Sequence, residues 1–219
     1  KLGYSTQGCR SYVGVAGGFI IGSSFGSSAT VMREKVGGLN GVKLAANDSL
    51  PCTKTTQLLR QALPEASRPL YAQEAIDISG EHTVLRLLPG YQHHLFDPAT
   101  KVRFFHGQYT VTDRSDRMGM RLEGPAVPCP SQQMLSEGIC LGAVQVPADG
   151  QPIVLLNDRQ TIGGYPKIGS VIARDIARLA QLRPGDTLRF EAVDLYQAHT
   201  INTLAQLKFD ATTLQHLKD

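Results

Sequence analysis

Short apolar segments separated by glycine- and proline-containing turns make up most of this 219-residue chain. Such a pattern is typical of short β-strands, because glycine and proline supply the backbone angles that tight turns require. The clearest hairpin signal is GAVQVP–ADGQ–PIVLL, in which Asp149-Gly150 separates two apolar runs. Further strands are expected within residues 11–20, 42–50, 83–90, 102–113, 120–125 and 187–193. The chain is therefore expected to be mainly β, a barrel or sandwich with few helices.

Helices are expected in two places. Residues 167–182 carry apolar side chains at helical spacing, and the tail from residue 197 to 217 is also expected to be helical, in two pieces. LPEASRP, residues 63–69, is rich in proline and polar residues and is the candidate linker. We therefore predict one domain in residues 1–75 and a second in residues 76–219, which ends in the helical tail.

Charge and cysteine content exclude several classes of protein. The net charge is only +3, whereas a nucleic-acid binder needs a dense basic face. The stretch GVAGGFIIG is too short to span a bilayer, so no membrane segment is expected. The four cysteines form no CxxC pair, which argues against a zinc site, and their low number is typical of a reduced, cytoplasmic protein. His93 and Asp97 are interpreted as part of a polar loop rather than as metal ligands or an acid–base pair.

NDRQTIGGYPKIG, residues 157–169, places many polar side chains directly after an apolar run. A carboxylate, an amide, two kinds of hydroxyl and an amine at one corner suit a small polar substrate. These groups belong to Asp158, Gln160, Thr161, Tyr165 and Lys167. Gly163 and Gly164 allow positive φ or close approach of a ligand to the backbone. The alternative is structural, with Asp158 and Thr161 capping the expected helix. Spacing alone leaves both interpretations open.

Two arginines raise a similar choice. Arg117 lies in SDRMGMRLEGP, and Arg33 follows GSSAT. Each is either a solvated surface charge or a planar fork that binds a carboxylate. No GxxxxGK[ST] loop, helix-opening GxGxxG or GxSxG elbow occurs, so a nucleotide site would have to be of another type.

Several long motifs resemble one family in sequence and order. Residues 115–125, 136–169 and 180–190, together with GCRSYVGVAGGF and FGSSATVMREKVGGLNG, are similar to the KipA or allophanate hydrolase subunit 2 family, which includes PxpC, the C-subunit of 5-oxoprolinase. The resemblance runs from about residue 8 to residue 193. It implies further chain ahead of Lys1, a partial β-rich first subdomain like carboxyltransferase subdomain A, and a cyclophilin-like β-barrel second subdomain like subdomain B.

The resemblance also implies a function. Together with the other two 5-oxoprolinase components, a KipI-like B-subunit and an A-subunit, such a protein converts 5-oxo-L-proline to L-glutamate with ATP, which we expect to bind on a partner or at a shared interface. The alternatives are a biotin-dependent carboxyltransferase domain of the urea carboxylase type, and a non-enzymatic regulator that binds a KipI-like kinase inhibitor. The residues expected to form the site are catalytic Asp158, Tyr165 and Lys167, and substrate-binding Arg117, Gln160, Thr161, Gly163, Gly164 and Arg33. Ile162 stands where the family usually has a second threonine, which leaves Thr161 as the hydroxyl expected to matter.

Overall fold

The computed structural model describes residues 8–15, 17–54, 83–130 and 134–211. The chain divides into two units, one of residues Ser11–Leu70 and Leu214–Asp219, the other of Lys1–Arg10 and Tyr71–Thr213. The linker predicted at residues 63–69 lies outside the described residues, and the domain boundary at residue 75 stays a prediction.

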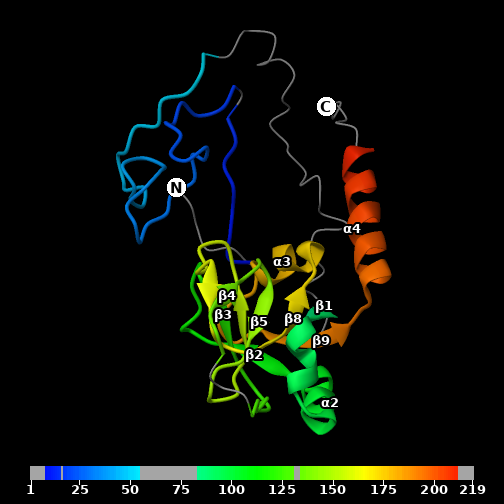
Figure 1. Cartoon of the computed structure of the whole chain (residues 1–219). Coiled ribbons are helices and arrows are strands. Elements are labelled where there is room, and N and C mark those ends of the chain that lie inside the picture. Colours follow the sequence, from blue (N-terminus) through cyan, green and yellow to red (C-terminus); the bar gives the residue numbers. More distant parts are fainter. Residues whose placement is uncertain (1–7, 16, 55–82, 131–133, 212–219) are drawn as a thin grey trace. The chain divides into compact units, whose positions relative to one another are not determined.

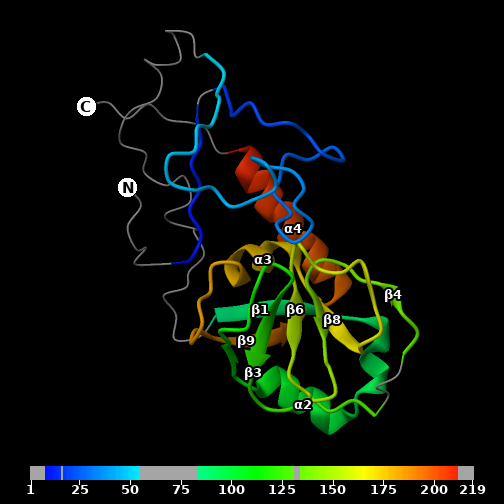
Figure 2. The same ribbon diagram turned by 90° about the vertical axis from the view of Figure 1, so that its left-hand side faces the viewer.

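A closed β-barrel forms the centre of the larger unit, as Figures 1 and 2 show. Its strands follow one another around the barrel in the order β1-β8-β5-β6-β3-β2-β9. They are β1 (Thr83–Pro89), β2 (Tyr109–Val111), β3 (Gly119–Glu123), β5 (Ala143–Gln145), β6 (Ile153–Leu155), β8 (Lys167–Val171) and β9 (Thr187–Ala192). Neighbouring strands are antiparallel except β1 and β9, which pair in parallel and close the barrel. The predicted mainly-β class with a barrel and few helices is confirmed.

The hairpin predicted around Asp149-Gly150 is present. Strands β5 and β6 pair antiparallel, and Gly150 has φ +72°, a conformation that favours glycine. A second, two-stranded sheet joins β4 (Glu137–Gly138) to β7 (Ile162–Gly163). This small sheet fastens the loop after β6 to the segment before β5.

Two predicted elements were wrong in type. Strand was expected over residues 102–113, but the first part of this range belongs to helix α2 (Pro98–His106). Only β2 agrees with the prediction. Residues 167–171, expected to open a helix, form strand β8 instead. The other helical elements of the described part are η1 (Tyr91–Leu95), α3 (Ala173–Leu179) and α4 (Leu195–Asp210). The tail was therefore predicted correctly as helical, although α4 is one piece as far as it is described.

Helix α2 lies at one end of the barrel and α3 at the other, as Figures 1 and 2 show. Asp97 caps α2 by accepting hydrogen bonds from the Thr100 backbone N–H and hydroxyl, which lower the pKa of its carboxyl. From α2, the buried ring of Phe104 stacks on Phe190 of β9 with centroids 4.6 Å apart. Tyr109 packs against both rings, so an aromatic cluster closes this end of the core.

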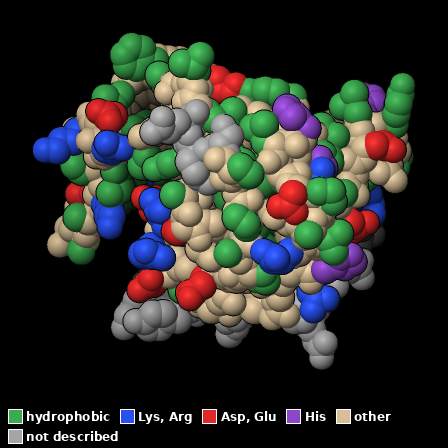
Figure 3. Space-filling view, turned by 60° about the horizontal axis from the view of Figure 1, so that its bottom comes forward, with side chains coloured by type: hydrophobic (Ala, Val, Ile, Leu, Met, Phe, Trp, Pro, Cys, Tyr) green, Lys and Arg blue, Asp and Glu red, His purple; other side chains and the backbone are tan. Residues whose placement is uncertain are grey.

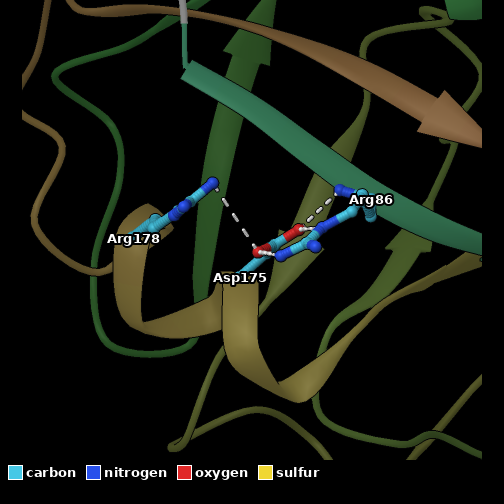
Figure 4. A network of polar contacts seen from close by, with 3 residues as sticks. All are labelled: Arg86, Asp175 and Arg178. Atoms are coloured by element: carbon cyan, nitrogen blue, oxygen red, sulfur yellow. Dashed lines mark hydrogen bonds and ion pairs between the residues drawn. The ribbon is translucent and has the colours of Figure 1, made fainter. Parts of the chain in front are cut away.

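A buried ion pair ties α3 to the barrel. The Asp175 side chain is fully buried, and its Oδ2 accepts hydrogen bonds from the backbone N and the Nε of Arg86, both at 2.8 Å. Its Oδ1 accepts from Arg86 Nη2 at 2.6 Å. Figure 4 shows the Asp175 carboxylate between Arg86 on β1 and Arg178 on α3. Arg178 Nη1 lies 4.0 Å from Asp175 Oδ1. These hydrogen bonds raise the pKa of Arg86.

The smaller unit has little regular structure within residues 11–54. Its backbone pairing consists of isolated bridges between Phe19 and Cys52, Ser24 and Ser27, and Val31 and Val36. The strands predicted at residues 11–20 and 42–50 were therefore wrong for the described part. Positive φ angles at Gly17 and Gly18 in the first stretch and at Asn47 in the second place turns inside both, and these turns interrupt the extended runs that a sheet requires.

The described surface carries charges of both signs. Figure 3 shows Lys and Arg side chains interspersed with Asp and Glu on one face, rather than gathered in a single basic patch. Among the described residues, no helix is long and apolar enough to cross a membrane.

His93 is expected to make the stability of the barrel depend on pH. Its Nε2 is buried and has no hydrogen-bond partner among the residues that the structure describes, and burial together with the charge of Lys101 lowers its pKa. The unfolded chain has the ordinary value near 6.5, so on acidification it takes up this proton before the folded chain does. The His93 contribution is therefore fully present above about pH 6.5 and is lost as the pH falls toward the folded pKa.

We expect His93→Phe to reduce the loss of stability between about pH 7.5 and about pH 5.5. Urea unfolding at the two pH values measures this loss. His106→Phe, a change at an exposed histidine of α2, is the control and should keep the wild-type pH dependence. An unchanged pH dependence in His93→Phe would show that His93 is not responsible.

Candidate functional site

Arg117 and Asp158, both predicted site residues, are brought together. Arg117 Nε lies 2.8 Å from Asp158 Oδ2, and Nη2 lies 3.0 Å from Oδ1. The Asp158 side chain is 18% exposed and that of Arg117 is 52% exposed. This two-point pairing uses Nε and Nη2, so Asp158 orients the guanidinium. Nη1 and one hydrogen of Nη2 have no partner among the described residues.

Strand register explains why these two residues meet. Gly119 of β3 pairs with Leu155 of β6, so the loop before β3 lies beside the loop after β6. The Asp158 N–H donates to the Arg117 carbonyl at 2.9 Å, which joins the two loops. Asp116 Oδ1 accepts from the N–H groups of Met118 and Gly119 and holds the turn that carries Arg117.

Lys167, at the start of β8, belongs to a separate polar cluster, here called the Lys167 cluster and composed of Tyr91, Gln92, Glu137 and Lys167. The Lys167 side chain is 11% exposed, and the only contact of its Nζ within the described part is an ion pair with Glu137 Oε1. Gln92, which is 2% exposed, donates from Nε2 to Glu137 Oε1 and to the Tyr91 hydroxyl. Gln92 Oε1 accepts from the Lys167 backbone N–H at 2.7 Å.

The side chains of Gln160, Thr161 and Tyr165 are exposed, and Tyr165 is 50% exposed. They make no hydrogen bond with a described residue. The backbone of this loop is nevertheless fixed, because the Thr161 carbonyl accepts from the Ile139 N–H at 2.9 Å. The proposed helix-capping role of Asp158 and Thr161 is wrong, because a strand and not a helix follows Pro166.

Gly163 and Gly164 do not have the positive φ that the sequence allowed. A Cβ at Gly163 would lie 2.6 Å from the Ile139 side chain, and one at Gly164 would lie 2.8 Å from the Met134 carbonyl. Both glycines therefore let the loop pack against the segment around β4, and their contact with a ligand stays a prediction. Arg33, in the other unit, is exposed, with Nε 3.8 Å from Glu34 Oε1.

Gln92 and Glu137 were not singled out from the sequence. They stand 45 residues apart, and Lys167 is 75 residues from Gln92. No local spacing links three such positions, so only the barrel topology could reveal the cluster. Asp97, discussed as a metal ligand beside His93, is instead the cap of α2. The described residues contain no group of three or more His, Cys, Asp or Glu side chains arranged to hold a metal.

Comparison with known proteins identifies the family. A family model for the carboxyltransferase domain, subdomain A and B, matches residues 1–192. The chain is 36% identical to the 5-oxoprolinase C-subunit of Haemophilus influenzae over 96% of its own length and 64% of that protein. It is also 36% identical to the Escherichia coli protein of that name, over 88% of this chain and 59% of that protein. The chain thus spans less than two thirds of either relative.

A solved structure supports the fold. The Kluyveromyces lactis urea carboxylase aligns with a TM-score of 0.79 over 97% of this chain and 20% of that chain, at 22% identity. At this identity the likeness concerns the fold alone, and it agrees with the family assigned from the sequence comparison. The chain therefore belongs to the family of carboxyltransferase domains with subdomains A and B.

Proposed function

We propose that this chain is part of one component of an ATP-dependent 5-oxoprolinase, which acts with a KipI-like B-subunit and an A-subunit to convert 5-oxo-L-proline to L-glutamate. Two relatives at 36% identity are named as the C-subunit of 5-oxoprolinase, whereas a relative named as a putative urea carboxylase is 28% identical. The structural observation that carries the proposal is the half-exposed Arg117, oriented by Asp158 with one edge of its guanidinium available.

Arg117 is assigned to the carboxylate of 5-oxoproline. A guanidinium binds a carboxylate with two parallel hydrogen bonds, and the edge formed by Nη1 and Nη2 supplies the donors. Asp158 is already engaged with Nε and Nη2, so its role is to hold the arginine. Tyr165, with a half-exposed phenol on the adjoining loop, is assigned to proton transfer, and Gln160 and Thr161 to hydrogen bonds with the substrate.

ATP is assigned to activation of the lactam carbonyl. Amide resonance makes direct hydrolysis slow, and phosphorylation of the carbonyl oxygen provides a better leaving group. The sequence has no phosphate loop, and the Gly163 backbone pairs with Glu137 in the small sheet rather than forming a phosphate cradle. We therefore propose that ATP binds mainly on a partner protein or at a shared interface. We also propose that the assembled enzyme is cytoplasmic.

A second candidate is biotin-dependent carboxyl transfer of the urea carboxylase type. The description of the matching family as a carboxyltransferase domain favours it. In that case carboxybiotin would arrive on a partner or carrier, and the site on this chain would bind the accepting amide, as in the first proposal.

The test is to express the full-length protein with its partner proteins and to assay two reactions. We expect ATP-dependent formation of glutamate from 5-oxoproline, and loss of this activity when the present component is omitted. Carboxylation of urea or another amide, without glutamate formation, would instead establish the second candidate. A complex that binds the KipI-like partner but performs neither reaction would leave the regulatory alternative.

A further inference from the structure

Of the two charged side chains in the Lys167 cluster, the carboxylate of Glu137 is accessible and the ammonium of Lys167 is not. The Nζ of Lys167 is buried, whereas the Glu137 side chain is 32% exposed at the edge of the small sheet. The two positions lie on β8 and β4, and Gln92 from η1 joins them. The phenol of Tyr91 is 69% exposed, so a ligand that approaches this cluster meets the phenol and the carboxylate before the ammonium.

The contacts of Glu137 are one-sided. The hydrogen bond from Gln92 Nε2 and the closest contact of the Lys167 ammonium both fall on Oε1. No hydrogen bond to Oε2 occurs within the part of the chain that the structure describes. A carboxylate accepts hydrogen bonds on both oxygens, so the cluster holds one oxygen in place and leaves the other available.

The surroundings keep this carboxylate oriented. Lys167 supplies the balancing positive charge at short range, and Gln92, nearly fully buried, is itself fixed by the Lys167 backbone N–H and the Tyr91 hydroxyl. A residue whose own position is locked by a surrounding hydrogen-bond network is what a binding group requires. Lys167 and Gln92 are thus positioning residues for Glu137.

We propose that Glu137 Oε2 accepts a hydrogen bond from the amide N–H of the substrate, with Lys167 and Gln92 holding the carboxylate. A carboxylate oxygen can only accept hydrogen bonds, so Oε2 of Glu137 favours ligands that place an N–H group at this point. Amide N–H groups are present in both 5-oxoproline and urea, so the assignment of Glu137 applies to either candidate reaction. The choice of 5-oxoproline as the probe rests on the proposed function.

The test compares two ligands that differ in one group. The first is 5-oxoproline, and the second is the lactone 5-oxotetrahydrofuran-2-carboxylate, in which a ring oxygen replaces the N–H. Calorimetric titration of the assembled complex without ATP measures both affinities. Because hydrogen bonds to charged groups are strong, we expect the wild type to prefer the lactam by about 10- to 150-fold.

The variants are chosen so that the fold survives. Glu137→Met alone would leave the buried Lys167 ammonium without a counter-charge. The informative variant is therefore Glu137→Met combined with Lys167→Met, which replaces the ion pair by apolar side chains of similar size. Its urea unfolding midpoint should be close to that of the wild type. We expect the preference for the lactam to fall to about one in this variant, while its affinity for the lactone is kept. Glu137→Gln combined with Lys167→Met keeps a neutral acceptor without leaving an unpaired ammonium, and should give an intermediate preference.

Matched controls and opposing outcomes complete the test. Glu123→Met, a change at an exposed glutamate of β3, should keep the full preference. A double methionine variant that retains the preference, or that loses affinity for both ligands equally, would overturn the assignment of Glu137. If the wild-type complex binds urea but not 5-oxoproline, the proposed function is wrong. The inference is then tested with urea, and the affinity for urea must be lower in the double methionine variant than in the wild type. A wild type that binds neither ligand overturns both.

Discussion

Asp175→Ala is expected to lower the free energy of unfolding by about 3–5 kcal/mol. The side chain is fully buried and accepts three hydrogen bonds from Arg86, so its removal leaves the guanidinium and a backbone N–H without their acceptor. The Arg86 side chain is only 23% exposed, so water replaces the lost carboxylate incompletely, and removing one member of such a pair is costly. Urea unfolding of the full chain, followed by circular dichroism, measures the effect.

Two further variants separate this ion pair from a general effect of mutation. Arg178→Ala removes only the more distant contact, at 4.0 Å, and should cost less than about 1 kcal/mol. Replacing the pair by apolar side chains, Arg86→Met with Asp175→Leu, should recover most of the loss, because no charge then stays buried. If Asp175→Ala were as stable as Arg178→Ala, the pair in Figure 4 would not be what fastens α3 to β1.

Local signals allowed much of the barrel to be predicted. The Asp149-Gly150 turn and the alternating segments around it specify β5 and β6 without reference to the rest of the chain. Helix α2 could have been predicted from the local sequence, because Asp97 followed by Pro98 is typical of the start of a helix. At β8 the apolar residues Ile168 and Val171 are three positions apart, a spacing that suits a helix, and tertiary packing made the segment a strand. A Cβ at Gly169 would collide with Leu87 on the neighbouring β1.

The site was predictable only in part. Asp158 and Arg117 could be selected because polar side chains and turns cluster at strand ends, where binding residues often lie. Their pairing depends on the register between β3 and β6, which no local pattern specifies. Glu137 and Gln92 lacked any signal, because the cluster forms only when three distant segments meet at one edge of the barrel.

Arg117→Ala is expected to lower kcat/KM for 5-oxoproline by about 10- to 150-fold, the equivalent of about 1.5–3 kcal/mol for a hydrogen-bonded charge pair. The substrate carboxylate is remote from the reacting carbonyl and is bound equally before and during reaction, so the effect should fall mainly on KM. Stability should change little, because the Arg117 side chain is 52% exposed and such pairs contribute less than about 1 kcal/mol.

Arg121→Ala is the matched control. Arg121 lies on β3, four positions after Arg117 in the same motif, and is exposed. Its backbone groups contact Ser115, and these contacts do not depend on the side chain. A general loss of positive charge near this loop would affect both variants, whereas a specific contact with the substrate carboxylate would affect only Arg117→Ala.

The rate of ATP-dependent glutamate formation by the assembled full-length proteins, measured over a range of 5-oxoproline concentrations, is the decisive measurement. We expect wild type and Arg121→Ala to give the same kcat/KM, and Arg117→Ala to need far more 5-oxoproline to reach a similar kcat. Equal KM values for all three proteins would show that the loops joined by Arg117 and Asp158 do not bind the substrate, and would contradict the site described above.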